Sequence, residues 1–183
     1  MAKQHPELDA RLRDFIARQH IFFTASAAAT GRVNVSPRST TALRVLGPKA
    51  VIYLDLTGSG NETAAHLKAD GRLTIMFCAV EGPPQILRLY GHGRVIRRGG
   101  EEYGAVLADH FHGEEPLGAR QMVRLDAEIV QTSCGFGVPL FSYQGERDSL
   151  DRWAANKGPE GIQAYQREQN RISMDGFPTG LFE

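Results

Sequence analysis

The sequence lacks a long hydrophobic run and contains few cysteines. No apolar stretch approaches the roughly 20 residues that a transmembrane helix needs. The first residues lead directly into a segment of helical periodicity, without the apolar stretch of a signal peptide. The 183 residues include two cysteines, Cys78 and Cys134, which are too few for a disulfide framework. We therefore expect a cytoplasmic protein with reduced thiols and no membrane contact.

An excess of charge of either sign is also missing. Lys and Arg together number 21, as do Asp and Glu, and the basic residues are scattered along the chain. The sequence thus has no basic field that would favour nucleic acid or anionic lipid as a partner. The metal-ligand spacings Cys-x-x-Cys and His-x-x-x-His are absent, and His110 and His112 would point to different faces of a helix. We expect no nucleic-acid partner and no metal site.

Short apolar or alternating runs, each bounded by turn residues, occupy most of the chain. They predict six strands, at residues 21–25, 32–36, 50–56, 72–80, 86–96 and 121–132. Helices are expected at residues 6–19, 61–69, 100–112, 148–156 and 159–171. Residues 72–80 are apolar almost throughout, which is typical of a strand buried on both faces. The segment Gly91-His92-Gly93 indicates a bulge where the sheet bends.

The separations between the strands resemble those of hairpins, and helices lie only at the ends and in connections. This arrangement predicts a mainly β chain with flanking helices (α+β), built on a six-stranded antiparallel barrel. We expect a single domain over residues 1–183, with the barrel at about residues 20–132 and a C-terminal helical extension at about residues 146–172. A doubly wound dinucleotide fold is disfavoured, because only one segment resembles a βαβ unit.

The most informative motif is the turn Gly58-Ser59-Gly60-Asn61-Glu62-Thr63, which follows an apolar strand and opens a short helix. Its glycines allow a tight turn and a close approach of the backbone to a ligand. Asn61 is a favoured helix cap residue, and the amides of a first helical turn carry partial positive charge. Such a turn suits a phosphate group, although an ordinary strand-to-helix turn has the same composition. A dinucleotide fingerprint is disfavoured, because Thr63 replaces its third glycine.

The ordered set of motifs resembles the pyridoxamine 5'-phosphate oxidase-like family, the FMN-binding split β-barrels. The resemblance covers the order of elements from about residue 8 to residue 131. It is carried by Val33-Asn34-Val35-Ser36-Pro37-Arg38, Val51-Ile52-Tyr53-Leu54-Asp55, Asn61-Glu62-Thr63-Ala64-Ala65-His66-Leu67, Arg72-Leu73-Thr74-Ile75-Met76-Phe77 and Arg88-Leu89-Tyr90-Gly91-His92-Gly93. The resemblance implies a split barrel of the FMN-binding type and a homodimer with FMN in a groove between the subunits.

The residues that would hold the FMN phosphate depart from the family pattern. The family supplies Ser or Thr and then Lys or Arg before the helix, whereas this chain has Asn61 and Thr63 with the acidic Glu62 between them. The resemblance therefore assigns phosphate binding to the side chains of Ser59, Asn61 and Thr63 and to the backbone of the turn, Gly60 included. The missing cation would be replaced by Arg38 and Arg88. Ser36 and Pro37 resemble the segment that runs past the flavin ring.

The C-terminal sequence also departs from the family. True pyridoxamine 5'-phosphate oxidases end in an Arg-x-His element that grips the substrate phosphate, and this chain has no such pair. We therefore expect that it does not oxidise pyridoxamine 5'-phosphate. The loop residues Cys134, Gly135 and Phe136 are candidates for a wall of the substrate pocket, and Cys134 is a candidate redox-active thiol.

These observations predict an FMN-binding flavoprotein that acts as an oxidoreductase on a small organic substrate. Because a flavin carries the redox chemistry itself, no catalytic side chain is assigned. Two alternatives stay open. An F420-dependent reductase on the same barrel would need cations for the acidic tail of its cofactor, with Arg38, Arg44, Arg88 and Lys68 as candidates. A non-catalytic flavin- or haem-binding module would need an axial ligand in the haem case, with His92 or His110 as candidates.

Overall fold

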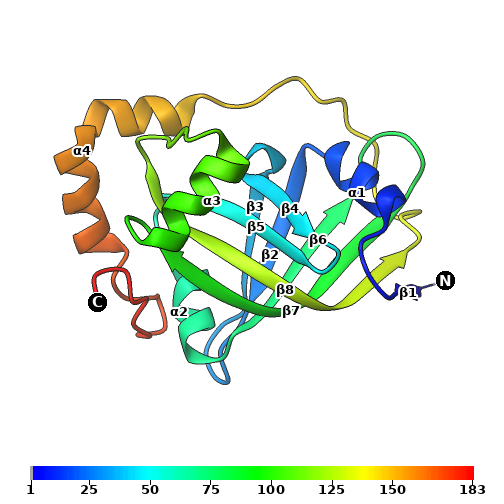
Figure 1. Ribbon diagram of the computed structural model, residues 1–183, viewed down its shortest axis with the longest axis horizontal. Helices are drawn as coiled ribbons and strands as arrows, with labels where there is room; N and C mark the ends of the chain where they lie inside the picture. Colours follow the sequence, from blue (N-terminus) through cyan, green and yellow to red (C-terminus); the bar gives the residue numbers. More distant parts are fainter. Residues whose placement is uncertain (1) are drawn as a thin grey trace.

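The computed structural model describes residues 2–183. Its strands form a curled antiparallel sheet, and the helices lie around its ends and edges (Figure 1). Seven strands follow one another in the order β3-β2-β6-β7-β8-β5-β4, and β1 pairs with β8. The strands are β1 (Lys3–His5), β2 (Ile21–Ser26), β3 (Asn34–Ser39), β4 (Leu43–Gly47), β5 (Ala50–Leu56), β6 (Arg72–Cys78), β7 (Ile86–Arg97) and β8 (Ala119–Ser133). The helices are α1 (Ala10–Ala17), α2 (Glu62–Ala69), α3 (Glu101–Phe111) and α4 (Ser149–Gln169), with a 3-10 turn, η1 (Thr40–Ala42), between β3 and β4.

The expected split-barrel fold is confirmed, but the expected number of six strands is wrong. The sheet contains eight strands, because β1 and β4 were not predicted. β1 has three residues and is polar, and β4 has five residues, of which Leu43, Val45 and Leu46 are apolar. β3 and β4 are the two ends of the strand order, and within residues 2–183 no ladder joins them. The barrel is therefore open between these edges.

The two faces of the sheet differ in burial. In β2, Phe22, Thr24 and Ser26 are buried while the residues between them are half-buried. The prediction that residues 72–80 are buried on both faces is wrong, because β6 alternates in the same way and Thr74, Met76 and Cys78 are half-buried. The inner face packs in the core, whereas no helix covers the outer face of these central strands (Figure 1). Apolar outer residues such as Met76 therefore remain accessible in one chain.

The core consists of two clusters. The larger lies inside the curled sheet beneath α1, where Leu12 and Phe15 pack against residues such as Phe22 and Phe77. The smaller lies between the sheet and α3, and Tyr103 and Phe111 of α3 belong to it. Since burying a side chain of this kind contributes roughly 1.5–3 kcal/mol, these clusters account for the main stabilisation of the sheet.

An irregularity lies next to Gly91, where a bulge was predicted, but the extra residue is Glu128 of β8 and not a residue of β7. The register between β7 and β8 shifts between Tyr90 and Gly91. A Cβ atom at Gly91 would lie 2.1 Å from the main-chain oxygen of Asp126, so only glycine fits at this position.

The helices follow the sequence prediction with small shifts at their ends. α1 begins later than expected, because the side chain of Asp9 accepts a hydrogen bond from the Leu12 N–H at 2.8 Å and so caps it. The two predicted C-terminal helices are both present: α4 is divided by a kink at Gly158, whose φ of +65° and ψ of 172° are not helical, and its second part begins at Pro159. No helix within residues 2–183 has both the length and the hydropathy to cross a bilayer.

The C-terminal part of the chain crosses the molecule. After β8 the chain runs from the end of the sheet near β1 to α4 at the opposite end (Figure 1). The residues after α4 then lie beside α2 (Figure 1). We call residues 170–183 the C-terminal segment.

Candidate functional site

A cavity of about 340 Å³ lies where β3, the end of β5 and the start of α2 meet. We call it the α2 cavity. It is lined by Asn34, Ser36, Pro37, Arg38, Leu56, Gly58, Ser59, Gly60, Asn61, Glu62, Thr63 and Arg120. The site therefore lies at the opening of the barrel, next to the unpaired edge of β3.

Three carbonyls of the turn at residues 58–61 accept hydrogen bonds, whereas its amides have no acceptor in the described chain. Gly58 O accepts a hydrogen bond from Asn170 Nδ2 at 3.0 Å, and Gly60 O accepts one from Arg120 Nη1 at 2.9 Å. Asn61 O accepts from the N–H of Ala65 at 3.3 Å. In the described chain, no carbonyl or side-chain oxygen accepts from the main-chain N–H groups of residues 59–63. These donors at the start of α2 are the groups that bind an anion at a helix N-terminus.

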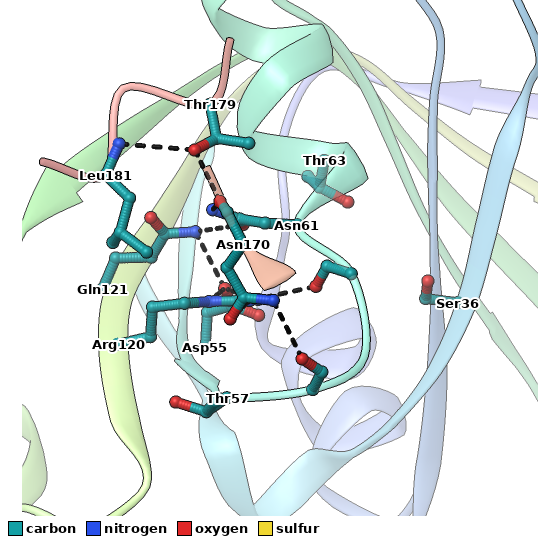
Figure 2. A network of polar contacts seen from close by, with 12 residues as sticks. Ser36, Asp55, Thr57, Asn61, Thr63, Arg120, Gln121, Asn170, Thr179 and Leu181 are labelled. Atoms are coloured by element: carbon teal, nitrogen blue, oxygen red, sulfur yellow. Dashed lines mark hydrogen bonds and ion pairs between the residues drawn. The ribbon is translucent and has the colours of Figure 1, made fainter. Parts of the chain in front are cut away.

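A buried ionic network lies behind the turn (Figure 2). Arg120 donates to Asp55 Oδ2 at 2.7 Å, and Arg38 donates to Asp55 Oδ1 at 2.7 Å. Gln121 Nε2 joins the same carboxylate to Asn61 Oδ1, with both distances 2.8 Å. The side chains of Asp55 and Arg120 are 2% and 3% exposed, whereas that of Arg38 is 21% exposed and lines the α2 cavity. Both arginines line the cavity, and Arg38 is the more exposed of the two.

The hydrogen-bond partners of Asp55 keep its buried carboxylate ionised. Burial alone would raise the pKa of the Asp55 carboxyl, but Arg120, Arg38 and Gln121 together hold that pKa below its usual value. Tyr53 lies beneath the guanidinium of Arg38, 4.6 Å from the ring centre, and burial raises the pKa of Tyr53 to about 12. The site therefore contains one ionised carboxylate between two guanidinium groups, with a neutral tyrosine below them.

The structure corrects one detail of the predicted turn and shows what holds Glu62. Asn61 occupies the cap position of α2, but its side chain makes no capping hydrogen bond. That side chain instead joins the network through Gln121 and Asn170, so Asn61 faces an anion with its main-chain N–H only. Glu62 does not point freely into solvent, because both of its carboxylate oxygens accept from the Met174 N–H at 3.2 Å. The C-terminal segment therefore holds the one acidic side chain of the cavity lining.

The structure brings most of the predicted cofactor residues together. The α2 cavity is lined by Ser36, Pro37, Arg38, Ser59, Gly60, Asn61 and Thr63, which come from two segments about 20 residues apart in sequence. Arg88 lies elsewhere, on β7, where its guanidinium donates to Ser133 Oγ at 3.1 Å. Within one chain, Arg88 does not line the cavity. Its predicted role would require a second copy of the chain.

The predicted substrate-pocket residues lie outside the α2 cavity. Cys134 is exposed, and Phe136 is 84% exposed. Gly135 packs against main-chain atoms of Gln85, since an added Cβ would lie 2.8 Å from the Gln85 nitrogen. These three residues belong to the segment that follows β8. Within one described chain, they do not contact the turn at residues 58–61.

The sequence analysis missed four residues of the network: Asp55, Arg120, Gln121 and Asn170. The sequence did contain a pattern that marks Asp55. It is an acidic residue within the apolar run of β5, and an acidic residue in such a run requires a buried partner. The adjacent pair Arg120-Gln121 at the start of β8 offered the partner donors. No local pattern marked Asn170, which lies over 100 residues from the turn that it contacts.

The residues proposed for other cofactors are dispersed. Arg44 donates to the main-chain oxygens of His110, Thr41 and Leu43, and Lys68 pairs with Glu183. Of the four cations proposed for F420, Arg38 lines the α2 cavity, whereas Arg44, Arg88 and Lys68 do not. His92 packs on Gly71 beside a separate cavity.

Known proteins resemble this chain in sequence and in fold. The family model for pyridoxamine 5'-phosphate oxidase matches residues 8–134. The pyridoxamine 5'-phosphate oxidase family protein ustO of Aspergillus flavus is 36% identical over 192 residues, covering 95% of this chain and 76% of that protein.

Two solved structures share the fold. HupZ of Group A Streptococcus, as a variant with one histidine replaced by alanine, aligns with a TM-score of 0.56 and 19% identity over 69% of this chain and 99% of HupZ. HutZ, the haem storage protein of Vibrio cholerae, aligns with a TM-score of 0.52 and 17% identity over 71% of this chain and 98% of HutZ. At these identities the two structures establish the fold alone. The family model and the fungal relative, together with the split barrel, establish that this chain belongs to the pyridoxamine 5'-phosphate oxidase family.

Proposed function

We propose that the protein is a homodimeric FMN-dependent oxidoreductase of the pyridoxamine 5'-phosphate oxidase family. In this proposal, the main-chain amides of residues 59–63 bind the terminal phosphate of FMN. The observation that carries it is the bonding of the turn: the carbonyls of Gly58, Gly60 and Asn61 accept hydrogen bonds from the protein, whereas within residues 2–183 the N–H groups of residues 59–63 have no acceptor. An anion supplies the acceptor that these amides lack.

The side chains around the α2 cavity suit a phosphate. Ser59 and Thr63 add hydroxyls next to the amides, and Ser36 faces them from β3. Arg38 adds a guanidinium that is already oriented by Asp55. The bond from Met174 keeps the Glu62 carboxylate engaged, which limits its repulsion of an anion. The residues present therefore fit the phosphate of FMN without the usual cation of the family turn.

The open face of the sheet supports the homodimer in this proposal. Val33 and Val35 of the edge beside the cavity are 69% and 61% exposed, and Met76 and Tyr90 are half-buried on the same sheet. Exposed apolar surface of this extent is typical of an interface. A second copy over this face would bring Arg88 of one chain toward the flavin of the other and would complete the groove that one chain forms in part.

When bound, FMN supplies the transfer of hydride or electrons to and from a small organic substrate. The residues of this chain bind and orient the cofactor: the amides hold the phosphate, and Pro37 and Arg38 lie where β3 passes the cavity. A network of buried, hydrogen-bonded side chains behind the turn keeps these donors in place before the ligand arrives.

Titration of FMN into the purified protein, followed by the quenching of flavin fluorescence, tests the proposal. We expect saturable binding of one FMN per chain, in a dimer by light scattering. Arg38→Ala should weaken FMN binding by about tenfold, because it removes a charge-assisted contact. Arg94→Ala is the matched control, since Arg94 is an exposed arginine that pairs with Glu102 away from the cavity.

Protein that binds no FMN, or an Arg38→Ala variant that binds as tightly as the wild type and the control, would contradict the cofactor site. The enzymatic part is tested separately, by the rate at which a reduced nicotinamide bleaches the bound flavin. Binding without bleaching by any reductant would leave a flavin-binding module.

A further inference from the structure

We propose that Asn170 is a positioning residue for the phosphate-binding turn, so that the C-terminal segment sets the affinity of the protein for the phosphate of its cofactor. The inference rests on the FMN site proposed above. Asn170 follows α4 directly and is fully buried. It lies beyond residues 8–134, the part of the chain that the family model matches.

Every polar group of Asn170 has a partner. Its Nδ2 donates to Gly58 O at 3.0 Å, and its Oδ1 accepts from Arg120 Nη1 at 2.8 Å. Its main-chain oxygen accepts from Asn61 Nδ2 at 3.4 Å and from Thr179 Oγ1 at 2.7 Å. Asn170 therefore contacts the turn on both sides, at Gly58 and at Asn61, and also holds the arginine that binds Gly60 (Figure 2).

These contacts determine which way the peptide groups of the turn point. In a trans peptide, the C=O and the following N–H point in opposite directions. The bond from Asn170 to Gly58 O therefore turns the N–H of Ser59 away from Asn170, and the bond from Arg120 to Gly60 O does the same for the N–H of Asn61. Without them, a turn with two glycines could rotate and present a carbonyl oxygen to the phosphate, which would repel it.

The remainder of the C-terminal segment holds Asn170 and closes around the start of α2. Met174 donates its N–H to Glu62, and the Asp175 carboxylate accepts from the Arg32 N–H at 2.6 Å in the β2–β3 connection. Thr179 bonds back to Asn170, as above. The segment is thus tied to both parts of the chain that border the α2 cavity. Its ordered position presets the turn, so a ligand does not have to order it on binding.

The experiment compares FMN with riboflavin, which has the same ring system and no phosphate. We would measure both affinities by fluorescence quenching for the wild type, Asn170→Ala and Asn170→Asp. Asn170→Asp keeps the size of the side chain and an acceptor for Arg120, but it replaces the donor to Gly58 O with a second oxygen. Both variants should bind FMN about tenfold more weakly, the equivalent of one hydrogen bond to a charged group, while riboflavin affinity stays unchanged.

Ser173→Ala is the matched control within the same segment. Ser173 is buried, and its hydroxyl accepts from the Phe177 N–H at 3.0 Å without contacting the turn. This variant should keep the wild-type ratio of FMN to riboflavin affinity. The 31P chemical shift of bound FMN should move in the Asn170 variants and stay in place in the control.

The outcomes separate the two proposals. Wild-type protein that binds neither flavin would overturn the FMN site and this inference with it. A wild type that prefers FMN, with Asn170 variants that keep that preference or lose both flavins equally, would overturn the positioning role alone. An equal loss of preference in Ser173→Ala would also overturn it, because general disturbance of the segment would then suffice.

Discussion

Replacement of Arg120 by methionine tests how strongly the buried network stabilises the fold. Methionine keeps much of the length of the side chain but removes the hydrogen bonds to Asp55, Gly60 and Asn170. The Asp55 carboxylate, 2% exposed, would lose one of its two cationic partners. Removing one member of a buried ion pair costs about 3–5 kcal/mol, because the remaining charge is left buried without compensation.

The expected loss lies at the lower end of that range, because Arg38 and Gln121 still contact Asp55. We therefore expect the free energy of unfolding of Arg120→Met to fall by about 3 kcal/mol. For a domain of this size, the melting temperature would fall by roughly 6–12 °C. Urea denaturation and calorimetry of the flavin-free protein measure both quantities. The double variant Asp55→Asn, Arg120→Met should lose less than the sum of the two single variants, since it leaves no buried carboxylate.

The pH dependence provides a second measurement on the same variant. Because the pKa of Asp55 is lowered in the folded protein, its contribution is present above the ordinary aspartate pKa of about 3.9 and is lost as pH falls through the folded value. In Arg120→Met the folded pKa rises toward the unfolded value, so acid should remove less stability through Asp55, and the difference in unfolding free energy between wild type and variant should narrow as pH falls below about 4. A loss below about 1 kcal/mol at neutral pH, or a strictly additive double variant, would refute the reasoning, since such values are typical of exposed pairs.

Two further predictions concern particular glycines and the thiols. Gly91→Ala should destabilise the fold by several kcal/mol in urea denaturation, because its Cβ would lie 2.1 Å from a main-chain oxygen of β8. Gly104→Ala, within α3 and with nothing within 4 Å of the added Cβ, should instead stabilise it by about 0.5–1 kcal/mol; equal effects at the two positions would contradict this account. With a thiol reagent at pH 8, Cys134 should react quickly, because it is exposed, and Cys78 slowly, because burial raises its pKa. Fast reaction that persists in Cys134→Ser would show the assignment to be wrong.

Local patterns were sufficient to locate most elements. The apolar run of β5, the turn at Gly58 and the short helix α2 appear in the structure where the sequence predicted them. An irregularity next to Gly91 was also predicted from the glycine pair, but the extra residue lies in β8. β4 and β1 were missed because both are short, and β1 also pairs with β8, a strand far from it in sequence. Likewise, β6 was expected to be buried on both faces, since the composition of a strand does not show whether anything covers its second face.

The sequence by itself determined the order of most strands and helices and the place of the turn at residues 58–61, because hydrophobic periodicity and glycine positions act over a few neighbouring residues. Only the tertiary structure decided how that turn is held. Its carbonyls are bonded by Arg120 and Asn170, which are 60 and 112 residues away in sequence from Gly60 and Gly58. Such bonds depend on the path of the whole chain around the sheet, and no local pattern encodes the distance between two side chains that meet only after folding.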